Sequence, residues 1–145
     1  MEFSGLFYSL TTPLNICRAL LASHKGIRFV GLASRNGELV AHLQRRGMTA
    51  LLDNSELEVS VVLSLIRMAT RSSLSRKLGS VLYSITAYEN IQRITVPIYN
   101  TVSELDGILM ISVDADVEIR GNTGKMILDK AEELISPLRH SQSLY

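Results

Sequence analysis

Three acidic side chains alternate in the sequence DADVEIRG, and carboxylates in this arrangement could hold a metal ion. If the stretch is a strand, Asp114, Asp116 and Glu118 point to one of its faces. Hard cations such as Mg²⁺ and Ca²⁺ prefer such oxygen ligands, but the stretch lacks the ordered calcium-loop pattern with its sixth-position glycine. We therefore expect a solvated strand end here and no metal site.

The sequence RGNTGKM, residues 120–126, brings glycines to the start of a helix, where backbone N–H groups and the helix dipole can hold an anion. A phosphate-binding P-loop needs four residues between its glycines and a hydroxyl residue after its lysine. Here only Asn122 and Thr123 separate the glycines, and Met126 follows Lys125. The pattern favours a helix start capped by Asn122 or Thr123 over a phosphate site.

Catalytic residues are not brought together by any motif. The histidines His24, His42 and His140 are scattered, and no serine or cysteine has the context of a nucleophile elbow or a cysteine protease. Only His42, close to Glu38, could act as a base. Cys17 has apolar neighbours at helical spacing, which indicates a core position. We predict no catalytic residue, no cofactor and no enzymatic activity.

A basic cluster follows the end of a long middle helix and comprises Arg67, Arg71, Arg76 and Lys77. Positive charge at a helix C-terminus is stabilised by the helix dipole, and the same cluster could form a docking patch for an acidic partner. The chain has no tryptophan and no interleaving of basic with aromatic residues. Stacking on nucleic-acid bases is therefore not favoured.

Length and composition are those of one globular domain. The chain has 145 residues, of which 46% are hydrophobic and 20% charged, with a net charge of +1. So small a net charge exerts no long-range pull toward nucleic acid or membrane. A single cysteine cannot form an internal disulfide, which suits the cytoplasm. The N-terminal sequence lacks the basic start of a signal peptide, and we expect no membrane span.

The elements that position these residues follow the order α-β-β-α-β-β-β-α. We predict helices over residues 13–23, 56–71 and 122–136, and strands over residues 27–34, 39–45, 81–88, 91–99 and 107–118. They form a single domain over residues 13–138. Residues 1–12 are an N-terminal extension with an apolar stripe (Phe3, Leu6, Phe7 and Leu10), and residues 139–145 are a frayed tail.

Local signals predict the helix starts. Thr12 and Pro13 have the pattern of an N-cap followed by proline in the first helical turn. Ser55 and Glu58 have the spacing of a capping box at the start of the middle helix.

The strand patterns predict the order of the sheet. The strands at 27–34 and 107–118 are apolar on both faces, so they need cover on both sides. The strands at 39–45 and 81–88 alternate apolar with polar residues, which suits the edges. The simplest packing is an α+β fold with a five-stranded antiparallel sheet in the order 2-1-5-4-3 and helices on both faces.

Turn and proline signals refine this sheet. Asn36-Gly37 predicts a tight primed turn between the first two strands, because such a turn needs positive φ at both central residues. Pro97, inside the strand at 91–99, implies a bulge, a strand end or an unpaired position.

The middle helix is too apolar to be covered by a sheet alone. At about 100° per residue its apolar side chains span roughly 240°, whereas a helix on a sheet needs a stripe a little over about 100° wide. Either the N-terminal extension covers the excess, or a second copy of the chain does. A dimer would bury the row Val59, Leu63 and Ile66, and the edge strand at 81–88 could pair with its mate.

The element order, the hairpin sequence GLASRNGELVA, the long apolar helix and the late strand DGILMISVD resemble the roadblock/dynein-light-chain family. This family belongs to the profilin-like group, and the sequence YENIQRITVPI resembles that of its small archaeal members. The resemblance covers about residues 13–136. It implies a non-catalytic homodimer that serves small GTPases or motor complexes as a regulator or scaffold. By position, the implied dimer interface comprises Val59, Leu63, Ile66, Val81, Tyr83 and Ile85.

An alternative function follows from the same group, which includes PAS-type modules. Such a sensor would bind a small molecule between the sheet and a helix, and it predicts a cavity of roughly a few hundred Å³ lined by the sheet face.

Overall fold

The computed structural model describes residues 12–140. In chain order the elements are α2 (Pro13–Ser23), β1 (Ile27–Ser34), β2 (Leu39–Gln44), α3 (Asn54–Ser72), α4 (Ser75–Leu78), β3 (Ser84–Ala87), β4 (Ile91–Tyr99), β5 (Leu105–Asp114), α5 (Asn122–Ile135) and the 3-10 helix η1 (Ser136–His140). Except for Thr12, the predicted N-terminal extension with its apolar stripe lies outside the described residues, and so does the predicted tail beyond His140.

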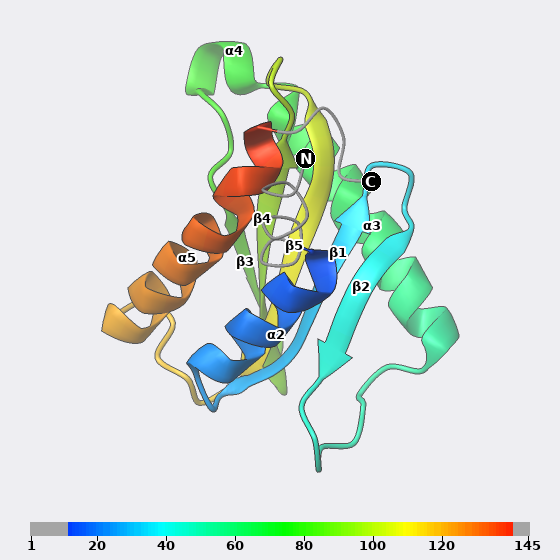
Figure 1. Ribbon diagram of the computed structural model, residues 1–145, viewed down its shortest axis with the longest axis vertical. Coiled ribbons are helices and arrows are strands. Elements are labelled where there is room, and N and C mark those ends of the chain that lie inside the picture. Colours follow the sequence, from blue (N-terminus) through cyan, green and yellow to red (C-terminus); the bar gives the residue numbers. More distant parts are fainter. Residues whose placement is uncertain (1–11, 141–145) are drawn as a thin grey trace, which may run out of the picture.

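The strands form one antiparallel sheet in the order β2-β1-β5-β4-β3, which confirms the predicted order and the α+β class. In Figure 1, α2 and α5 lie in front of this sheet and α3 lies behind it. The two central strands, β1 and β5, are therefore covered on both sides, which explains why they are apolar on both faces.

Two separate cores result from this layering. The larger core lies between the sheet and the helices α2 and α5, and it includes Ile16, Leu20, Leu109 and Ile127. The smaller core lies between the sheet and α3, and it comprises Ala33, Val61, Leu65, Met68, Ile108 and Met110. Cys17 is fully buried in the larger core, as predicted, and this burial raises the pKa of its thiol to about 12.

The predicted start of α2 is confirmed, whereas those of α3 and α5 are wrong. The Thr12 hydroxyl accepts a hydrogen bond from the Asn15 N–H at 3.3 Å. In α3 the capping box is formed by Asp53 and Glu56 instead of Ser55 and Glu58: the Asp53 carboxylate accepts from the Glu56 N–H at 2.8 Å, and the Glu56 carboxylate accepts from the Asp53 N–H at 3.0 Å. The same spacing occurs two residues earlier with a charged acceptor, which bonds more strongly than a hydroxyl.

At the start of α5 the N-cap is Gly121, and no side chain caps the helix. Asn122 and Thr123 lie inside the first turn, so neither is the predicted cap. The lysine of the predicted anion-site pattern is paired within α5, since Lys125 Nζ lies 2.8 Å from Asp129 Oδ2.

The turn between β1 and β2 differs from the predicted primed turn. Gly37 has a φ of 86°, but Asn36 does not have positive φ. The Gly37 N–H donates to the Ser34 carbonyl at 3.0 Å and the Ser34 N–H to the Glu38 carbonyl at 2.8 Å. These bonds close a three-residue loop over residues 35–37, with the positive φ at Gly37. The register of the pair also shifts between Leu32 and Ala33, where Val40 is the extra residue of β2.

The strand β5 ends at Asp114, four residues before its predicted end at 118. The chain turns there, with the Val117 N–H donating to the Asp114 carbonyl at 3.1 Å. The carboxylate of Asp114 forms an ion pair with Arg28, with 3.0 Å between Asp114 Oδ1 and Arg28 Nη1. The predicted row of carboxylates on one strand face is therefore wrong, because Asp116 and Glu118 lie beyond the strand.

The edge strand β3 begins at Ser84 and is shorter than predicted. It pairs with β4 only from Gln92 to Thr95, so Pro97 lies beyond this paired segment. On the other side, Pro97 stays in register opposite Ile108, and the irregularity falls between Ile98 and Tyr99. Pro97 is thus tolerated because the edge strand does not reach it.

Candidate protein interface

The outward face of α3 carries an apolar row. The exposed fractions are 58% for Val59, 43% for Leu63 and 56% for Ile66. Val61 and Met68, on the opposite side of the helix, are buried in the smaller core. The excess apolar surface predicted from the helical pattern is therefore present, and no residue between 12 and 140 covers it.

The β3 edge, one of the two edges of the sheet, contains the other predicted interface residues. β3 pairs only with β4, so its other side presents unpaired backbone groups. Tyr83 and Ile85 are 45% and 38% exposed, and Ile85 lies opposite Ile94, a residue of the larger core. Val81 is partly buried against the smaller core. The predicted interface residues thus lie on both faces of the sheet, on either side of the β3 edge.

A polar recess separates α3 from the edge strands. It is lined by Ser64, Arg67, Arg71, Ser84, Thr86, Tyr88, Arg93 and Thr95, and we call it the arginine recess. At the recess, β4 and β3 present polar side chains to α3 in place of core residues. The polar side of α3 faces these strands, which leaves its apolar row facing outward.

Arg93 is the buried cation of the arginine recess. Its residue is 8% exposed, and its guanidinium donates to the hydroxyls of Ser60 and Ser112. None of the carboxylates that the structure describes forms an ion pair with it. Burial lowers the pKa of Arg93; Tyr88 raises it and Arg67 lowers it. A buried charge with no opposite charge is costly, so the recess favours an anion.

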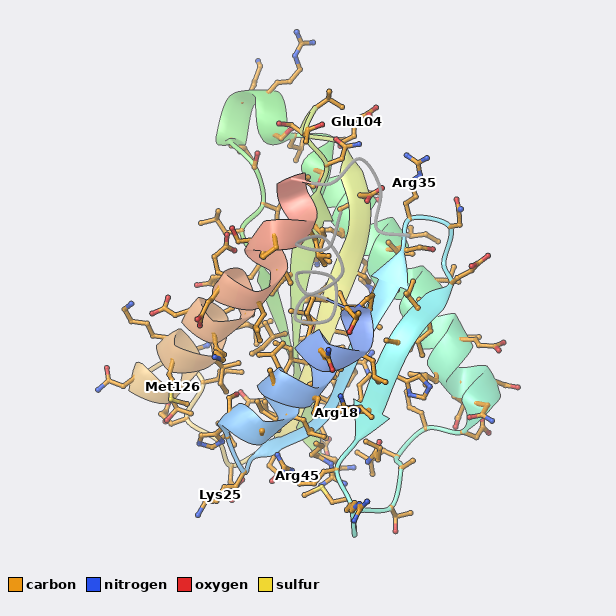
Figure 2. The ribbon with its side chains drawn as sticks, in the orientation of Figure 1. Arg18, Lys25, Arg35, Arg45, Glu104 and Met126 are labelled. Atoms are coloured by element: carbon orange, nitrogen blue, oxygen red, sulfur yellow. The ribbon has the colours of Figure 1, made fainter. Side chains whose placement is uncertain are left out.

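Arg45 provides a contrast, because its donors, which are only partly buried, are satisfied by the chain itself. Its guanidinium donates to the carbonyls of Leu21 at 2.5 Å, His24 at 2.8 Å and Ile27 at 2.6 Å. These carbonyls lie at the end of α2 and the start of β1, near the end of the molecule where Figure 2 labels Lys25 and Arg45. Arg93 has no comparable set of acceptors.

The sequence reasoning did not single out Arg93. The available signal was Arg93 as the one charged residue of the strand IQRITVPIY, since a buried charge needs a specific partner. The fold brings it next to Ser60 of α3, which is distant in the sequence.

The four residues of the predicted basic patch lie on two different helices. Arg67 and Arg71 lie on α3 and line the arginine recess. Arg76 and Lys77 lie on α4, which projects from the body of the molecule in Figure 1, beside the exposed Leu74 and Leu78.

The remaining sequence candidates stay isolated from one another. His42 is exposed on the edge strand β2, with its ring 5.9 Å from that of Phe29. In the described part of the chain, no group of three or more acidic, histidine or cysteine side chains is placed to hold a metal ion. Between residues 12 and 140 there is also no helix long and apolar enough to cross a membrane.

A groove of about 810 Å³ lies between the β3 edge and α5. Its lining includes the apolar side chains Tyr83, Ile85, Val96, Ile119 and Leu128, with Arg120, Lys125 and Asp129 among the charged ones. This groove lies between sheet and helix, where the alternative sensor function predicts a cavity.

Comparison with known structures defines the class of the fold. Neither a protein-family model nor a curated protein matches the chain. A roadblock/LC7 domain from Streptomyces avermitilis has a TM-score of 0.65 at 10% identity, covering 88% of this chain and 95% of that one. The chain therefore has the roadblock/LC7 fold, as its sequence resemblance implied.

Within this class, two structures of MglB are similar to the chain. The structure of MglB with a tetrameric arrangement has a TM-score of 0.64 at 18% identity, covering 86% of this chain and 85% of that one. The gliding protein MglB from Thermus thermophilus has a TM-score of 0.63 at 15% identity, covering 86% of this chain and 89% of that one.

Proposed function

We propose that this protein is a non-catalytic interaction module of the cytoplasm that works as a homodimer through α3 and the β3 edge. The observation that supports it is the exposed row Val59, Leu63 and Ile66 on the outward face of α3. Burying such a side chain fully contributes roughly 1.5–3 kcal/mol. A two-fold axis repeats each contact, so the row contributes twice to the interface.

The edge strand would extend this interface. Pairing of β3 with its mate continues the sheet across the dimer and satisfies the free backbone groups of the edge. Val81, Tyr83 and Ile85 then lie at or beside the seam. The tetrameric arrangement of the similar MglB structure also supports self-assembly through this fold.

As a dimer, the protein would act as a regulator or scaffold for a small GTPase or another signalling complex. The roadblock/LC7 fold supports this role, because the family that the sequence resembles works in this way. The cations Arg67, Arg71, Arg76 and Lys77 would provide the docking patch for an acidic partner. The similarity to small archaeal members remains a prediction.

Sedimentation velocity at micromolar concentration tests the dimer. We expect a species of twice the chain mass of 16.1 kDa, with dissociation on dilution. A protein that stays monomeric at the highest soluble concentration would contradict the proposal.

Small-molecule binding is the second candidate function, and the 810 Å³ groove between β3 and α5 is the observation that favours it. A ligand present at about 100 times its Kd should stabilise the fold by about 2.7 kcal/mol, which a thermal-shift screen of metabolites would detect. Leu128→Arg, which places a large side chain in the groove, should abolish the shift. A ligand whose shift persists in that variant binds elsewhere.

A further inference from the structure

The charges of α3 are distributed unevenly along the helix. Glu56 lies in the first turn, whereas Arg67 and Arg71 lie in the second half. At about 100° per residue these three side chains fall within roughly 60° of each other, beside Leu63. Along the helix axis Glu56 and Arg71 are roughly 22 Å apart, since each residue adds about 1.5 Å. They cannot pair within one chain.

The arginine recess has positive charge that nothing in the described chain neutralises. Arg93 forms its floor with only hydroxyl partners, and Arg67 and Arg71 lie on its α3 side. The ion pairs among residues 12–140 involve none of these three arginines. Covering the recess with another molecule would remove water from all three cations, so the covering surface needs to supply a carboxylate.

We propose that a second copy of this chain supplies it: in an antiparallel dimer, Glu56 of the partner subunit lies over the arginine recess and pairs with Arg67 and Arg71. This inference rests on the homodimer proposed above and specifies how its helices are aligned.

The register of an antiparallel helix pair leads to this contact. With Leu63 at the two-fold axis, each residue faces the partner residue that lies equally far on the other side. Glu56 precedes Leu63 by seven positions, so it faces position 70 of the partner, between Arg67 and Arg71. A parallel arrangement would instead place like charges together, which disfavours association.

Charge reversal tests this pairing. Glu56→Arg and Arg71→Glu should each weaken self-association by roughly 10- to 100-fold, because each variant places like charges together at two equivalent sites. Glu56→Gln should weaken it less, since glutamine at this position still completes the capping box. Glu58→Gln is the matched control: Glu58 is also exposed but lies roughly 160° around the helix, and its variant should dimerise as the wild type does.

Mixing the two reversed variants separates pairing between chains from effects within a chain. Both charges also complement the helix dipole, so each reversal destabilises its own α3. In a heterodimer of Glu56→Arg with Arg71→Glu, however, both sites again join opposite charges. We expect native mass spectrometry of an equimolar mixture to show heterodimers of near wild-type affinity. A loss of helix stability alone cannot be restored by mixing.

The outcomes distinguish this inference from the proposed function. If the wild type dimerises but the reversed variants dimerise equally well, or if mixing restores nothing, the alignment is wrong while the homodimer stands. If the wild type is monomeric, both proposals are wrong.

Discussion

Leu63→Glu is expected to convert the proposed dimer into a monomer that is still folded. Leu63 is 43% exposed in the single chain, and substitutions at such surface positions change stability by no more than about 0.5 kcal/mol. In the dimer the same residue lies at the two-fold axis, so the variant loses two buried leucines and brings two carboxylates together. Because the dimer newly buries only the exposed 43% of each leucine, the lost burial is roughly 0.6–1.3 kcal/mol per leucine, and the Kd should rise by roughly 10- to 80-fold from this loss alone.

Sedimentation velocity measures the mass, and circular dichroism measures the fold of the same sample. Val102→Glu is the control, because Val102 is an apolar residue with 68% exposure in the turn between β4 and β5 and does not belong to the apolar row of α3. That variant should remain dimeric. A Leu63→Glu protein that sediments as a dimer would show that the apolar row of α3 is not the interface.

Gly124→Ala is expected to destabilise the fold strongly. A Cβ atom at this position would lie 1.6 Å from the carbonyl oxygen of Ile119. Because this oxygen belongs to the backbone, a change of side-chain rotamer cannot relieve the clash. The first turn of α5 would have to lift from the preceding loop, which disturbs the burial of Ile127 and Ala131 in the larger core. We expect a loss of about 3 kcal/mol or more in the free energy of unfolding.

Urea unfolding at a fixed protein concentration measures this loss, since association also contributes to stability. Gly121→Ala is the matched control: its Cβ would be 3.6 Å from the nearest atom, an ordinary contact, so the variant should lose only about 1 kcal/mol, the cost of alanine at an N-cap. Helix propensity alone predicts that alanine at position 124 stabilises α5 by about 1 kcal/mol. A stabilised Gly124→Ala protein would therefore mean that α5 does not pack against Ile119 in this way.

The order of the sheet could be predicted because burial shapes the composition of each strand. β1 and β5 are apolar on both faces, and only the middle of a sheet with helices on both sides covers both faces. The boundaries were less predictable. Two capping boxes fit the start of α3, and only the backbone geometry selects Asp53 over Ser55. Similarly, β5 ends at Asp114, where the chain turns, although the alternating pattern continues to Glu118.

The candidate site was predictable in part. The apolar row Val59, Leu63 and Ile66 follows from the periodicity of one helix, and the structure leaves it exposed. The arginine recess could not be predicted, because it combines Arg93 of β4 with Arg67 and Arg71 of α3. These residues are distant in the sequence, and no local pattern indicates that they meet.

The sequence by itself determined the order of the five strands and of the helices α2, α3 and α5, together with the surplus of apolar surface on α3, because these depend on residues within a few positions of each other. It did not predict the short helices α4 and η1. Only the tertiary structure decided which side of α3 meets the sheet. Val61, Leu65 and Met68 pack on β1 and β5, and the polar flank of α3 faces the polar side chains of β3 and β4, so its second apolar row faces outward. The physical reason is that the orientation of a helix depends on the side chains of the strands it packs on. The periodicity of the helix sequence gives no information about those side chains.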